Sequence, residues 1–490
     1  MHFSIPDTEE FSDESGSTYM GYNIHINGVF HCTVRYRQLH NLHDQLKKEY
    51  GANNLPVFPP KKLLPLSSSQ LEERRAMLEK YIQSVGQDPQ LVNTDLFNGF
   101  LLSAQQETSC EKNQEVPLVV FLMNGYKIAL NVMTTERSDQ VLEKACHQLG
   151  LPSEYVYYFS LFLIKREEDG DITILRKLQD FESPYISQKS IQGVHRVVLR
   201  KSYWDPGYDL ELMSNQVALN MLYVQTVADV ERGWVLSSKE TKQQLASLQA
   251  RGAKKEYLEL ARTLKYYGFL QFRPCLCDYP RPGSRVLVSA GNRELNLRVR
   301  LAEGQDMREG SFKVTRMRCW RITTLHNNGE NSTGGSSSSS AAPGQSQLEL
   351  SFEYLMSKDK LQWITISSEQ AILMSVCLQA MVDELLLKKT GMKRKQPGDR
   401  IRKGSWSYMK RDGSSQLISV SQSASSDGIS TKTNSTNGDV KSPSKTEFST
   451  SSMRKISEKL SGVSLKSSSK QTPHPFVEND AFEGIGDEDL

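Results

Sequence analysis

The chain has 490 residues, of which 60 are Lys or Arg and 57 are Asp or Glu, so its formal net charge is +3. This near balance excludes a protein whose whole surface binds nucleic acid, because such surfaces need a strong positive excess. The length corresponds to roughly three or four domains. Hydrophobic residues make up 38% of the chain and the mean hydropathy is -0.50, which indicates that part of the chain buries little apolar surface.

The seven cysteines are scattered and form no C-x-x-C pair, which argues against a disulfide framework and a zinc knuckle. No stretch approaches the roughly 18 apolar residues of a membrane-spanning helix, and the first residues lack the apolar core of a signal peptide. The phosphate-loop, zinc-protease and serine-hydrolase motifs are missing as well. We therefore expect a cytosolic protein that contacts membranes only peripherally, has no catalytic residues, metal or cofactor, and is not an enzyme.

Residues 1–108 form the first predicted domain. Two alternating, strand-like runs meet at Asn27-Gly28, which is a strong hairpin signal. An amphipathic helix with a leucine stripe follows, and then a segment, 55–66, whose prolines exclude a helix or a central strand. Two further amphipathic helices complete a domain made of a small antiparallel sheet and helices.

Three further units follow in chain order. Residues 115–202 run as two strands, a helix and more strands, which is the order of a ubiquitin-like fold. Residues 203–271 have helical periodicity and predict a small all-helical unit. Residues 272–390 return to strand alternation and end in one long amphipathic helix, the arrangement of a pleckstrin or phosphotyrosine-binding domain. The polar tract 327–347 within them predicts a disordered surface insertion.

The last hundred residues differ sharply in composition. Residues 391–475 are rich in Ser and predict a disordered tail, because they cannot bury enough apolar surface to offset the entropy of ordering. The basic run 388–403 is compatible with a nuclear signal, an anionic membrane contact or a plain solvated linker, and we rank nucleic acid last. At 476–490 spaced apolar residues return among acidic ones, which is typical of a docking motif that folds on binding.

Together these units resemble a known domain combination. The ubiquitin-like, helical and phosphotyrosine-binding-like units resemble, in that order, the F1, F2 and F3 lobes of a FERM module. The lipid-binding marks of a PX domain also have counterparts here, namely Arg35-Tyr36, Pro59-Pro60-Lys61-Lys62 and Arg74-Arg75. A chain with both parts resembles the PX-FERM sorting nexins of endosomes. We therefore expect an α+β multidomain fold, a PX domain followed by a FERM-like module, with a disordered C-terminal tail.

The resemblance to PX domains implies a binding site for phosphatidylinositol 3-phosphate. In such a site a guanidinium binds the 3-phosphate in a bidentate manner, an aromatic ring packs under the inositol, and two more cations bind the bridging phosphate and the ring hydroxyls. These roles fall, respectively, on Arg35, Tyr36, Lys61 and Arg74. Taken singly, Arg35 and Arg74 are better explained as solvated surface charges, and only their combination with the hairpin, the proline loop and the helix spacing favours a lipid site.

Two neighbouring features bear on this site. Val34 stands where many PX domains place a second basic residue, so we do not expect additional phosphates to be recognised. Leu63, Leu64 and Leu66 lie beside the proline loop and are suited to the headgroup boundary of a membrane. The alternative for these leucines is an ordinary place in the core.

The third FERM lobe is expected to bind a peptide. An exposed edge of the strand 314–323 can add an extended segment through main-chain hydrogen bonds. The resemblance implies that this segment is the Asn-Pro-x-Tyr or Asn-x-x-Tyr motif of a receptor's cytoplasmic tail. The predicted groove residues are Trp320, Leu355, Cys377, Met381 and Val382. Without the resemblance, a plain hydrophobic core is the favoured explanation for Trp320 and for the helix residues at this spacing.

At the C-terminus the predicted docking residues are Phe482, Ile485 and Leu490. The resemblance implies that this end recruits the Retriever recycling complex. Residues 479–482, Asn-Asp-Ala-Phe, also repeat the Asn-x-x-aromatic pattern of cargo, which leads to the hypothesis that the chain's own end occupies the F3 groove.

We therefore expect an endosomal cargo adaptor, peripheral on the cytosolic face of early endosomes, that returns receptors to the cell surface and away from lysosomes. Weak contacts with lipid and cargo would reinforce each other through tethering. A second interpretation is a FERM-type cytoskeletal linker or small-GTPase effector, for which Lys127 is the well-placed cation on F1. An enzyme without a familiar motif is the third.

Overall fold

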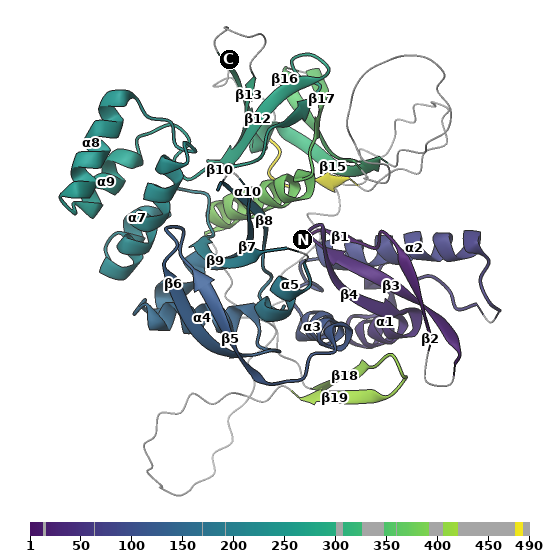
Figure 1. The fold of residues 1–490 in the computed structure, drawn as a ribbon. Coiled ribbons are helices and arrows are strands. Elements are labelled where there is room, and N and C mark those ends of the chain that lie inside the picture. Colours follow the sequence, from purple (N-terminus) through teal and green to yellow (C-terminus); the bar gives the residue numbers. More distant parts are fainter. Residues whose placement is uncertain are drawn as a thin grey trace, which may run out of the picture. The chain divides into compact units, whose positions relative to one another are not determined.

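A computed structural model of the protein describes residues 1–12, 16–62, 64–168, 170–191, 193–299, 307–325, 347–358, 360–391, 405–419 and 476–483. All of these residues lie in one compact unit, formed by Met1–Val420 together with Pro475–Leu490 (Figure 1). Within the described ranges, no helix is both long and apolar enough to cross a membrane.

The N-terminal domain begins with an antiparallel sheet in which β3 pairs with the three other strands. These strands are β1 (Phe3–Ser4), β2 (Thr8–Ser12), β3 (Thr18–Ile26) and β4 (Val29–Arg35). The turn between β3 and β4 is the predicted Asn27-Gly28 pair, whose φ angles of 51° and 82° are the positive values that a two-residue hairpin loop requires. Strands β1 and β2 extend the sheet beyond the predicted hairpin.

Three helices pack on this sheet. They are α1 (Tyr36–Tyr50), α2 (Ser68–Gln87) and α3 (Asp95–Ser109), with a short 3₁₀ turn, η1 (Ala52–Asn54), after α1. The predicted leucine stripe, Leu39, Leu42 and Leu46, is fully buried in the core of the domain. Residues 55–62 and 64–66 contain neither helix nor strand, as their prolines require.

The F1 lobe has the predicted ubiquitin-like topology. Its sheet order is β6-β5-β9-β7-β8, in which β9 pairs parallel with β5 and the other neighbours are antiparallel. The elements are β5 (Glu115–Phe121), β6 (Lys127–Met133), α4 (Ser138–Gln148), η2 (Ser153–Tyr158), β7 (Phe159–Arg166), β8 (Ile172–Lys177), α5 (Pro184–Lys189) and β9 (His195–Lys201). Helix α4 packs against β6 and β7, so one face of the sheet is covered.

The F2 lobe consists of α6 (Tyr208–Leu212), α7 (Gln216–Glu231), α8 (Lys239–Ala250) and α9 (Lys254–Ala261). Its first helix carries Asp209, whose carboxylate is fully buried. That carboxylate accepts hydrogen bonds from the hydroxyls of Tyr203 and Tyr267. It also lies 3.3 Å from the guanidinium of Arg262 and 3.6 Å from the ammonium of Lys201. A buried carboxylate is stable here because donors and cations surround it.

The F3 lobe is a sheet in the order β14-β13-β12-β11-β17-β16-β15-β20, with β10 beside β12. Its elements are β10 (Leu270–Gln271), β11 (Cys275–Cys277), β12 (Ser284–Gly291), β13 (Glu294–Val299), β14 (Arg308–Lys313), η3 (Val314–Arg316), β15 (Met317–Leu325), β16 (Gln347–Ser357), β17 (Lys360–Ser367), α10 (Ala371–Thr390) and β20 (Val477–Glu478). Helix α10 packs on β12, β15 and β16.

Two details of F3 differ from the sequence prediction. The strand predicted over 314–323 is divided, because its first three residues form the η3 turn and the strand begins only at Met317. The predicted insertion 327–347 lies outside the described residues except for Gln347, which already belongs to β16.

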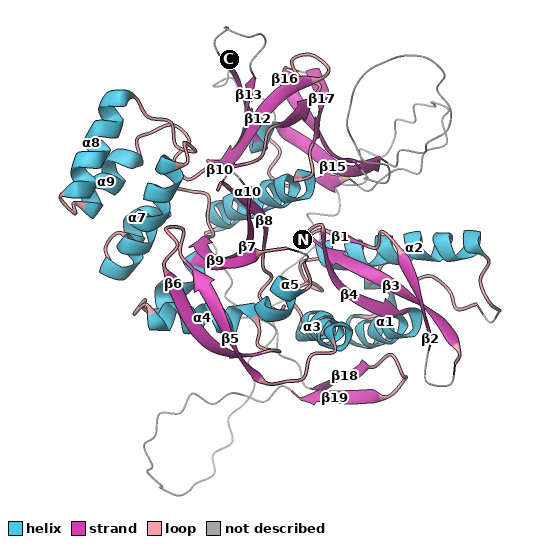
Figure 2. Cartoon of the chain, in the orientation of Figure 1, coloured by secondary structure: helices cyan, strands magenta, loops and turns pink. Residues whose placement is uncertain are grey.

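One part of the predicted disordered tail is ordered. Strands β18 (Ser405–Met409) and β19 (Ser415–Ser419) form an antiparallel hairpin that lies against α1 and α3 (Figures 1 and 2). Trp406 and Tyr408 are buried in the core of the N-terminal domain. The prediction of a disordered segment over 391–475 is therefore wrong for residues 405–419. Composition predicts disorder there, whereas the hairpin is stabilised by a surface that comes from the other end of the chain.

Candidate functional site

The predicted phosphoinositide residues lie on segments that meet beside the proline loop. Tyr36 is the first residue of α1, and its hydroxyl donates to the carbonyl of Pro59 at 2.7 Å. The guanidinium of Arg74, on α2, stacks over the Tyr36 ring at 4.4 Å from the ring centroid. The Nη2 atom of Arg74 is buried and has no hydrogen-bond partner among the described residues. Arg74 therefore has a donor to offer an anion at the place where the ring and the loop meet.

Arg35 is the last residue of β4 and directly precedes α1. Its guanidinium stacks over the Tyr19 ring at 3.7 Å from the centroid, and its Nη1 donates to the carbonyl of Arg411 at 2.9 Å. Arg411 lies in the turn of the β18–β19 hairpin. No local pattern around Arg35 indicates this contact, because its partner belongs to a segment that composition predicts to be disordered.

The neighbouring cations are engaged differently. Lys61 is exposed on the proline loop, whereas Lys62 lies 3.7 Å from a glutamate on α2. Arg75 pairs with Glu72 at 2.6 Å and also donates to the main-chain carbonyl of Ile5, which directly follows β1. Cations already paired with carboxylates offer less charge to a phosphate. This difference favours Lys61 and Arg74 over their immediate neighbours as ligand-binding residues.

The proline loop also presents apolar side chains to solvent. Val57 and Leu64 are 82% and 80% exposed, and Leu66 is half-buried. Leu63 lies outside the described residues. Exposed aliphatic side chains beside cations are suited to the headgroup boundary of a membrane.

Two tyrosine hydroxyls lie close enough to Arg74 to be affected by its charge. Burial raises the pKa of the Tyr36 hydroxyl, and the nearby Arg74 acts in the opposite direction. Burial also raises the pKa of Tyr22, again against the effect of Arg74. Both phenols therefore stay neutral at physiological pH. Arg74 therefore lies beside two neutral hydroxyl groups.

A second candidate site lies on the edge of the F3 sheet. Strand β20 pairs antiparallel with β15, with Trp320 opposite Val477 and Cys319 opposite Glu478. The edge at which the sequence predicts a partner peptide is therefore occupied by the chain's own C-terminal segment, residues 476–483. Main-chain pairing of this kind accepts any extended segment, so side chains must supply the specificity.

Asn479 supplies such a side chain. Its Nδ2 donates to the carbonyls of Val314 at 2.8 Å and Met317 at 2.7 Å, and its Oδ1 accepts the N–H of Ala481 at 3.0 Å. Its own N–H donates to the carbonyl of Arg318 at 3.2 Å. The η3 turn and the start of β15 thus form a pocket for a side-chain amide. Sequence reasoning misses this pocket because its acceptors are backbone carbonyls, which any residue can provide.

The C-terminal segment is also held on either side of Asn479. The Phe476 ring lies 5.8 Å from the Trp363 ring and 5.4 Å from the guanidinium carbon of Arg321. At the other end, Glu483 forms an ion pair with Lys389 near the end of α10. Aromatic, amide and ionic contacts therefore fix the register of the segment along β15.

The three predicted docking residues are only partly visible. Phe482 is half-buried, and its N–H donates to the carbonyl of Asn479 at 3.0 Å. Ile485 and Leu490 lie outside the described residues.

The predicted groove residues are mostly core residues. Trp320 is fully buried, and its indole N–H donates to the hydroxyl of Ser375 on α10 at 3.0 Å. The side chain therefore points into the lobe, and only its main chain takes part in the peptide edge. Met381 and Val382 are buried in the same cluster, which also includes Ala481 of the C-terminal segment. The hydrophobic core that is favoured without the resemblance therefore accounts for Trp320, Met381 and Val382.

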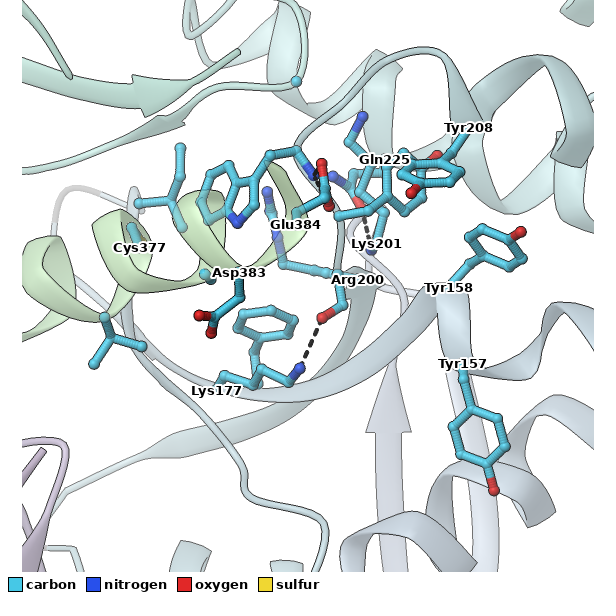
Figure 3. Close-up of a pocket in the computed structure, with 18 of the residues that line it drawn as sticks. Tyr157, Tyr158, Lys177, Arg200, Lys201, Tyr208, Gln225, Cys377, Asp383 and Glu384 are labelled. Carbon is cyan, nitrogen blue, oxygen red and sulfur yellow. Dashed lines mark hydrogen bonds between the residues drawn. The ribbon is translucent and has the colours of Figure 1, made fainter. Parts of the chain in front are cut away.

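Leu355 is likewise buried, and Cys377 lines a different feature. That feature is a cavity of about 690 Å³ where F1, F2 and α10 of F3 meet (Figure 3). Its walls carry the cations Lys177 and Arg200 together with the carboxylate of Glu384. Because both signs of charge line the cavity, it does not select a ligand by charge. In the described part of the chain, no group of three or more His, Cys, Asp and Glu side chains could hold a metal ion.

Models of four protein families match successive parts of the chain. The PX domain matches residues 22–104. The F1 lobe of the sorting nexin 17/27/31 FERM domain matches 116–204, and the F2 lobe of the sorting nexin 17/31 FERM domain matches 205–265. The Sorting Nexin 17 FERM C-terminal domain matches 268–386. These boundaries follow the lobes described above.

Relatives match over most or all of the chain. Sorting nexin-17 of Danio rerio is 49% identical and sorting nexin-17 of Homo sapiens 50% identical, each over 100% of both chains. Sorting nexin-31 of Homo sapiens is 37% identical over 79% of this chain and 86% of its own length.

The fold and these matches define the class: an α+β protein in which a PX domain precedes a three-lobed FERM module, as the sequence predicts. Within that class, the chain belongs to the sorting nexin-17 family. This is a family of non-enzymatic adaptors for endosomal sorting, so the expectation that the protein is not an enzyme is confirmed.

Proposed function

We propose that this protein is a cargo adaptor on early endosomes. It binds phosphatidylinositol 3-phosphate through the PX domain and Asn-Pro-x-Tyr or Asn-x-x-Tyr motifs of receptor tails through F3. Its C-terminus recruits the Retriever complex, which returns the cargo to the cell surface and prevents its lysosomal degradation. The observation that carries the proposal is the pair of carbonyls, Val314 and Met317, that bind the amide of Asn479 beside the β15 edge.

The lipid function is supported by the chemistry around the proline loop. Arg74 has a buried N–H without a partner among the described residues, and Tyr36 presents a ring that the loop holds through its hydroxyl. Lys61 is free of the ion pair that its neighbour Lys62 makes. Arg35 is the fourth of these lipid-binding residues. It binds the 3-phosphate in a bidentate manner, since a planar guanidinium matches two oxygens of a phosphate.

The cargo function follows from the contacts of the C-terminal segment. The asparagine of a cargo motif would bind the same two carbonyls as Asn479, and the preceding residues would pair with β15 as β20 does. Only one segment can occupy this edge at a time. Cargo and the chain's own end therefore compete, and cargo binding releases the C-terminal docking residues, Phe482, Ile485 and Leu490, for Retriever.

The lipid site is tested by co-sedimentation of the full chain with phosphatidylcholine vesicles, with and without phosphatidylinositol 3-phosphate. Arg35→Gln and Arg74→Gln should each lower lipid-dependent binding by on the order of tenfold or more, because each removes a charged hydrogen bond to the headgroup. Lys80→Gln, an exposed position on the same helix as Arg74, is the matched control and should bind like the unaltered protein.

Two results would contradict the proposal: binding that does not depend on the lipid, or binding that neither substitution weakens. In that case the alternative of a cytoskeletal linker or small-GTPase effector gains weight, with Lys127, exposed at the start of edge strand β6, as the first residue to substitute.

A further inference from the structure

The β18–β19 hairpin is docked on the PX domain by specific contacts. Gln45 on α1 and Ser407 bond each other twice: the amide Nε2 donates to the Ser407 carbonyl at 2.7 Å, and the Ser407 N–H donates to Oε1 at 2.9 Å. The Trp406 ring lies against Gly99 of α3 so closely that a Cβ on Gly99 would overlap its six-membered ring. Reciprocal bonds and close packing specify one docked position.

The hairpin also donates hydrogen bonds to the carboxylate of Glu107, near the end of α3. Its Oε2 accepts the hydroxyl of Tyr408 at 2.7 Å and the amide of Gln38 at 2.9 Å, and its Oε1 accepts the N–H of Arg411 at 2.8 Å. All three donors are uncharged groups, and two of them belong to the hairpin. Undocking would leave this carboxylate with fewer hydrogen-bond donors.

Arg411 connects Glu107 to Arg35, the predicted ligand of the 3-phosphate, and to the neighbouring Arg37. Its carbonyl accepts the Nη1 of Arg35 at 2.9 Å and also a bond from the guanidinium of Arg37. Its own guanidinium is fixed by the carbonyl of Thr33 at 2.7 Å. A neutral carbonyl orients a guanidinium without cancelling its charge, whereas a carboxylate in the same place would pair with it.

We propose that the hairpin contributes to lipid binding at the phosphoinositide site. In this proposal Arg411 and Tyr408 are positioning residues for Arg35. The Arg411 carbonyl and the Tyr19 ring fix one edge and the plane of the Arg35 guanidinium, so that its orientation toward the 3-phosphate is set before the lipid binds. Tyr408 and the Arg411 N–H keep Glu107 from competing with the phosphate. This inference rests on the proposed role of Arg35 as the ligand of the 3-phosphate.

The test uses a substitution outside both the hairpin and the lipid-binding residues. Gly99→Ala places a methyl group where the Trp406 ring lies, and alanine is the better helix former, so the substitution undocks the hairpin without weakening α3 itself. A double variant that adds Trp406→Phe to Gly99→Ala removes the ring atoms that overlap the new methyl group. In this variant the hairpin should dock again. Leu417→Ser, at a hairpin position that is 67% exposed, is the matched control.

Co-sedimentation of the full chain with phosphatidylcholine and phosphatidylserine vesicles, with and without phosphatidylinositol 3-phosphate, is the measurement. Gly99→Ala should lower the lipid-dependent affinity by on the order of tenfold, the equivalent of one hydrogen bond to a charged group. Binding to phosphatidylserine alone should not change, the double variant should recover most of the loss, and Leu417→Ser should bind normally. Hydrogen exchange of residues 405–419 verifies the undocking.

If hydrogen exchange shows that residues 405–419 stay docked in Gly99→Ala, the double variant Trp406→Ser/Tyr408→Ser replaces it. We expect the same loss of lipid-dependent affinity in that variant. Unchanged or tighter lipid binding after verified undocking overturns the inference, and tighter binding would make the hairpin an inhibitor. Arg35→Gln, measured in parallel, separates the two proposals. If Arg35→Gln weakens binding and undocking does not, only this inference fails; if Arg35→Gln has no effect, the lipid site itself is misplaced and both fail.

Discussion

The short side chain of Asn479 makes three hydrogen bonds in the pocket formed by η3 and the start of β15, which we call the amide pocket. Its Nδ2 reaches two carbonyls, and its Oδ1 closes the following turn by accepting the N–H of Ala481. Aspartate has the same shape but only acceptors when ionised, so it could not satisfy the carbonyls of Val314 and Met317. The requirement for asparagine in this position is therefore a matter of donors rather than of size.

Asn479→Ala should raise the affinity of the full chain for an Asn-Pro-x-Tyr peptide. The substitution removes two hydrogen bonds of the competing segment, each worth about 1 kcal/mol, so we expect a gain of roughly five- to thirtyfold. Fluorescence anisotropy with a labelled peptide measures it. Glu478→Ala, whose side chain is exposed in β20, should bind like the unaltered protein. An unchanged affinity for Asn479→Ala would show that the segment does not compete with cargo.

At the scale of elements, strand β4 joins the PX domain to F1 through His31. The His31 ring contacts Phe181 edge to face at 6.0 Å, and its Nε2 lies 3.0 Å from the carbonyl of Leu101 on α3. Beside it, Gln105 of α3 accepts the N–H of Ser183 and donates to the hydroxyl of Ser187, both at 2.8 Å. The junction is therefore a buried polar contact as well as an apolar one.

This junction predicts a pH dependence of stability. Burial lowers the pKa of His31 to about 4, whereas the unfolded chain titrates near 6.5. Between these values the unfolded state binds the proton and the folded state does not, so stability is lost as the pH falls from about 6.5 toward 4. The full contribution of one such histidine is roughly 3 kcal/mol.

Urea unfolding of the full chain, followed over this pH range, measures the effect. His31→Gln, which keeps a donor for the Leu101 carbonyl, should reduce the slope of the unfolding free energy against pH. His147→Gln, at an exposed position of α4, controls for the loss of a histidine as such. If both variants show the slope of the unaltered protein, His31 is not the group responsible.

At the scale of the whole molecule, two segments from beyond α10 bind the folded body. Residues 405–419 dock on the PX domain, and residues 476–483 dock on F3. Each lies at one of the two candidate binding sites. The proposed lipid site and the proposed cargo site are thus each contacted by a C-terminal segment of the same chain.

Vesicles that carry both phosphatidylinositol 3-phosphate and a tethered Asn-Pro-x-Tyr peptide should bind the protein more tightly than vesicles with either ligand. Once one site is bound, the second event is intramolecular, and we expect a gain on the order of 10²-fold in apparent affinity. Flotation of the full chain with the three vesicle types measures it, and a peptide with the Asn replaced by Ala is the control. Purely additive binding would mean that the two sites cannot engage one membrane together.

Much of this organisation is predictable from the sequence because it is local. The Asn27-Gly28 turn, the leucine stripe of α1, the proline loop and the order of strands and helices in F1 all depend on patterns of a few neighbouring residues. The candidate lipid residues are also predictable, since Arg35-Tyr36, Lys61 and Arg74 are side-chain signals at recognisable places in those patterns.

The remaining features depend on contacts between segments far apart in the chain. Whether Trp320 lines a groove or fills a core depends on where α10 places Ser375, and spacing along the strand is the same in both cases. The amide pocket consists of carbonyls, which leave no mark in the sequence. The hairpin 405–419 lies in a stretch whose composition predicts disorder, and it becomes ordered only because α1 and α3 supply partners for Trp406 and Tyr408.

The sequence by itself therefore determined the order and class of the domains and indicated candidate charged residues for a lipid site, because hydrophobic period, turn chemistry and charge act over short distances. The tertiary structure alone decided which cations are free of carboxylate partners, which apolar residues are core, and that two late segments return to the PX and F3 sites. Those outcomes depend on burial and on main-chain groups brought together from distant parts of the chain. Neither burial nor such long-range contacts can be predicted from a single short segment.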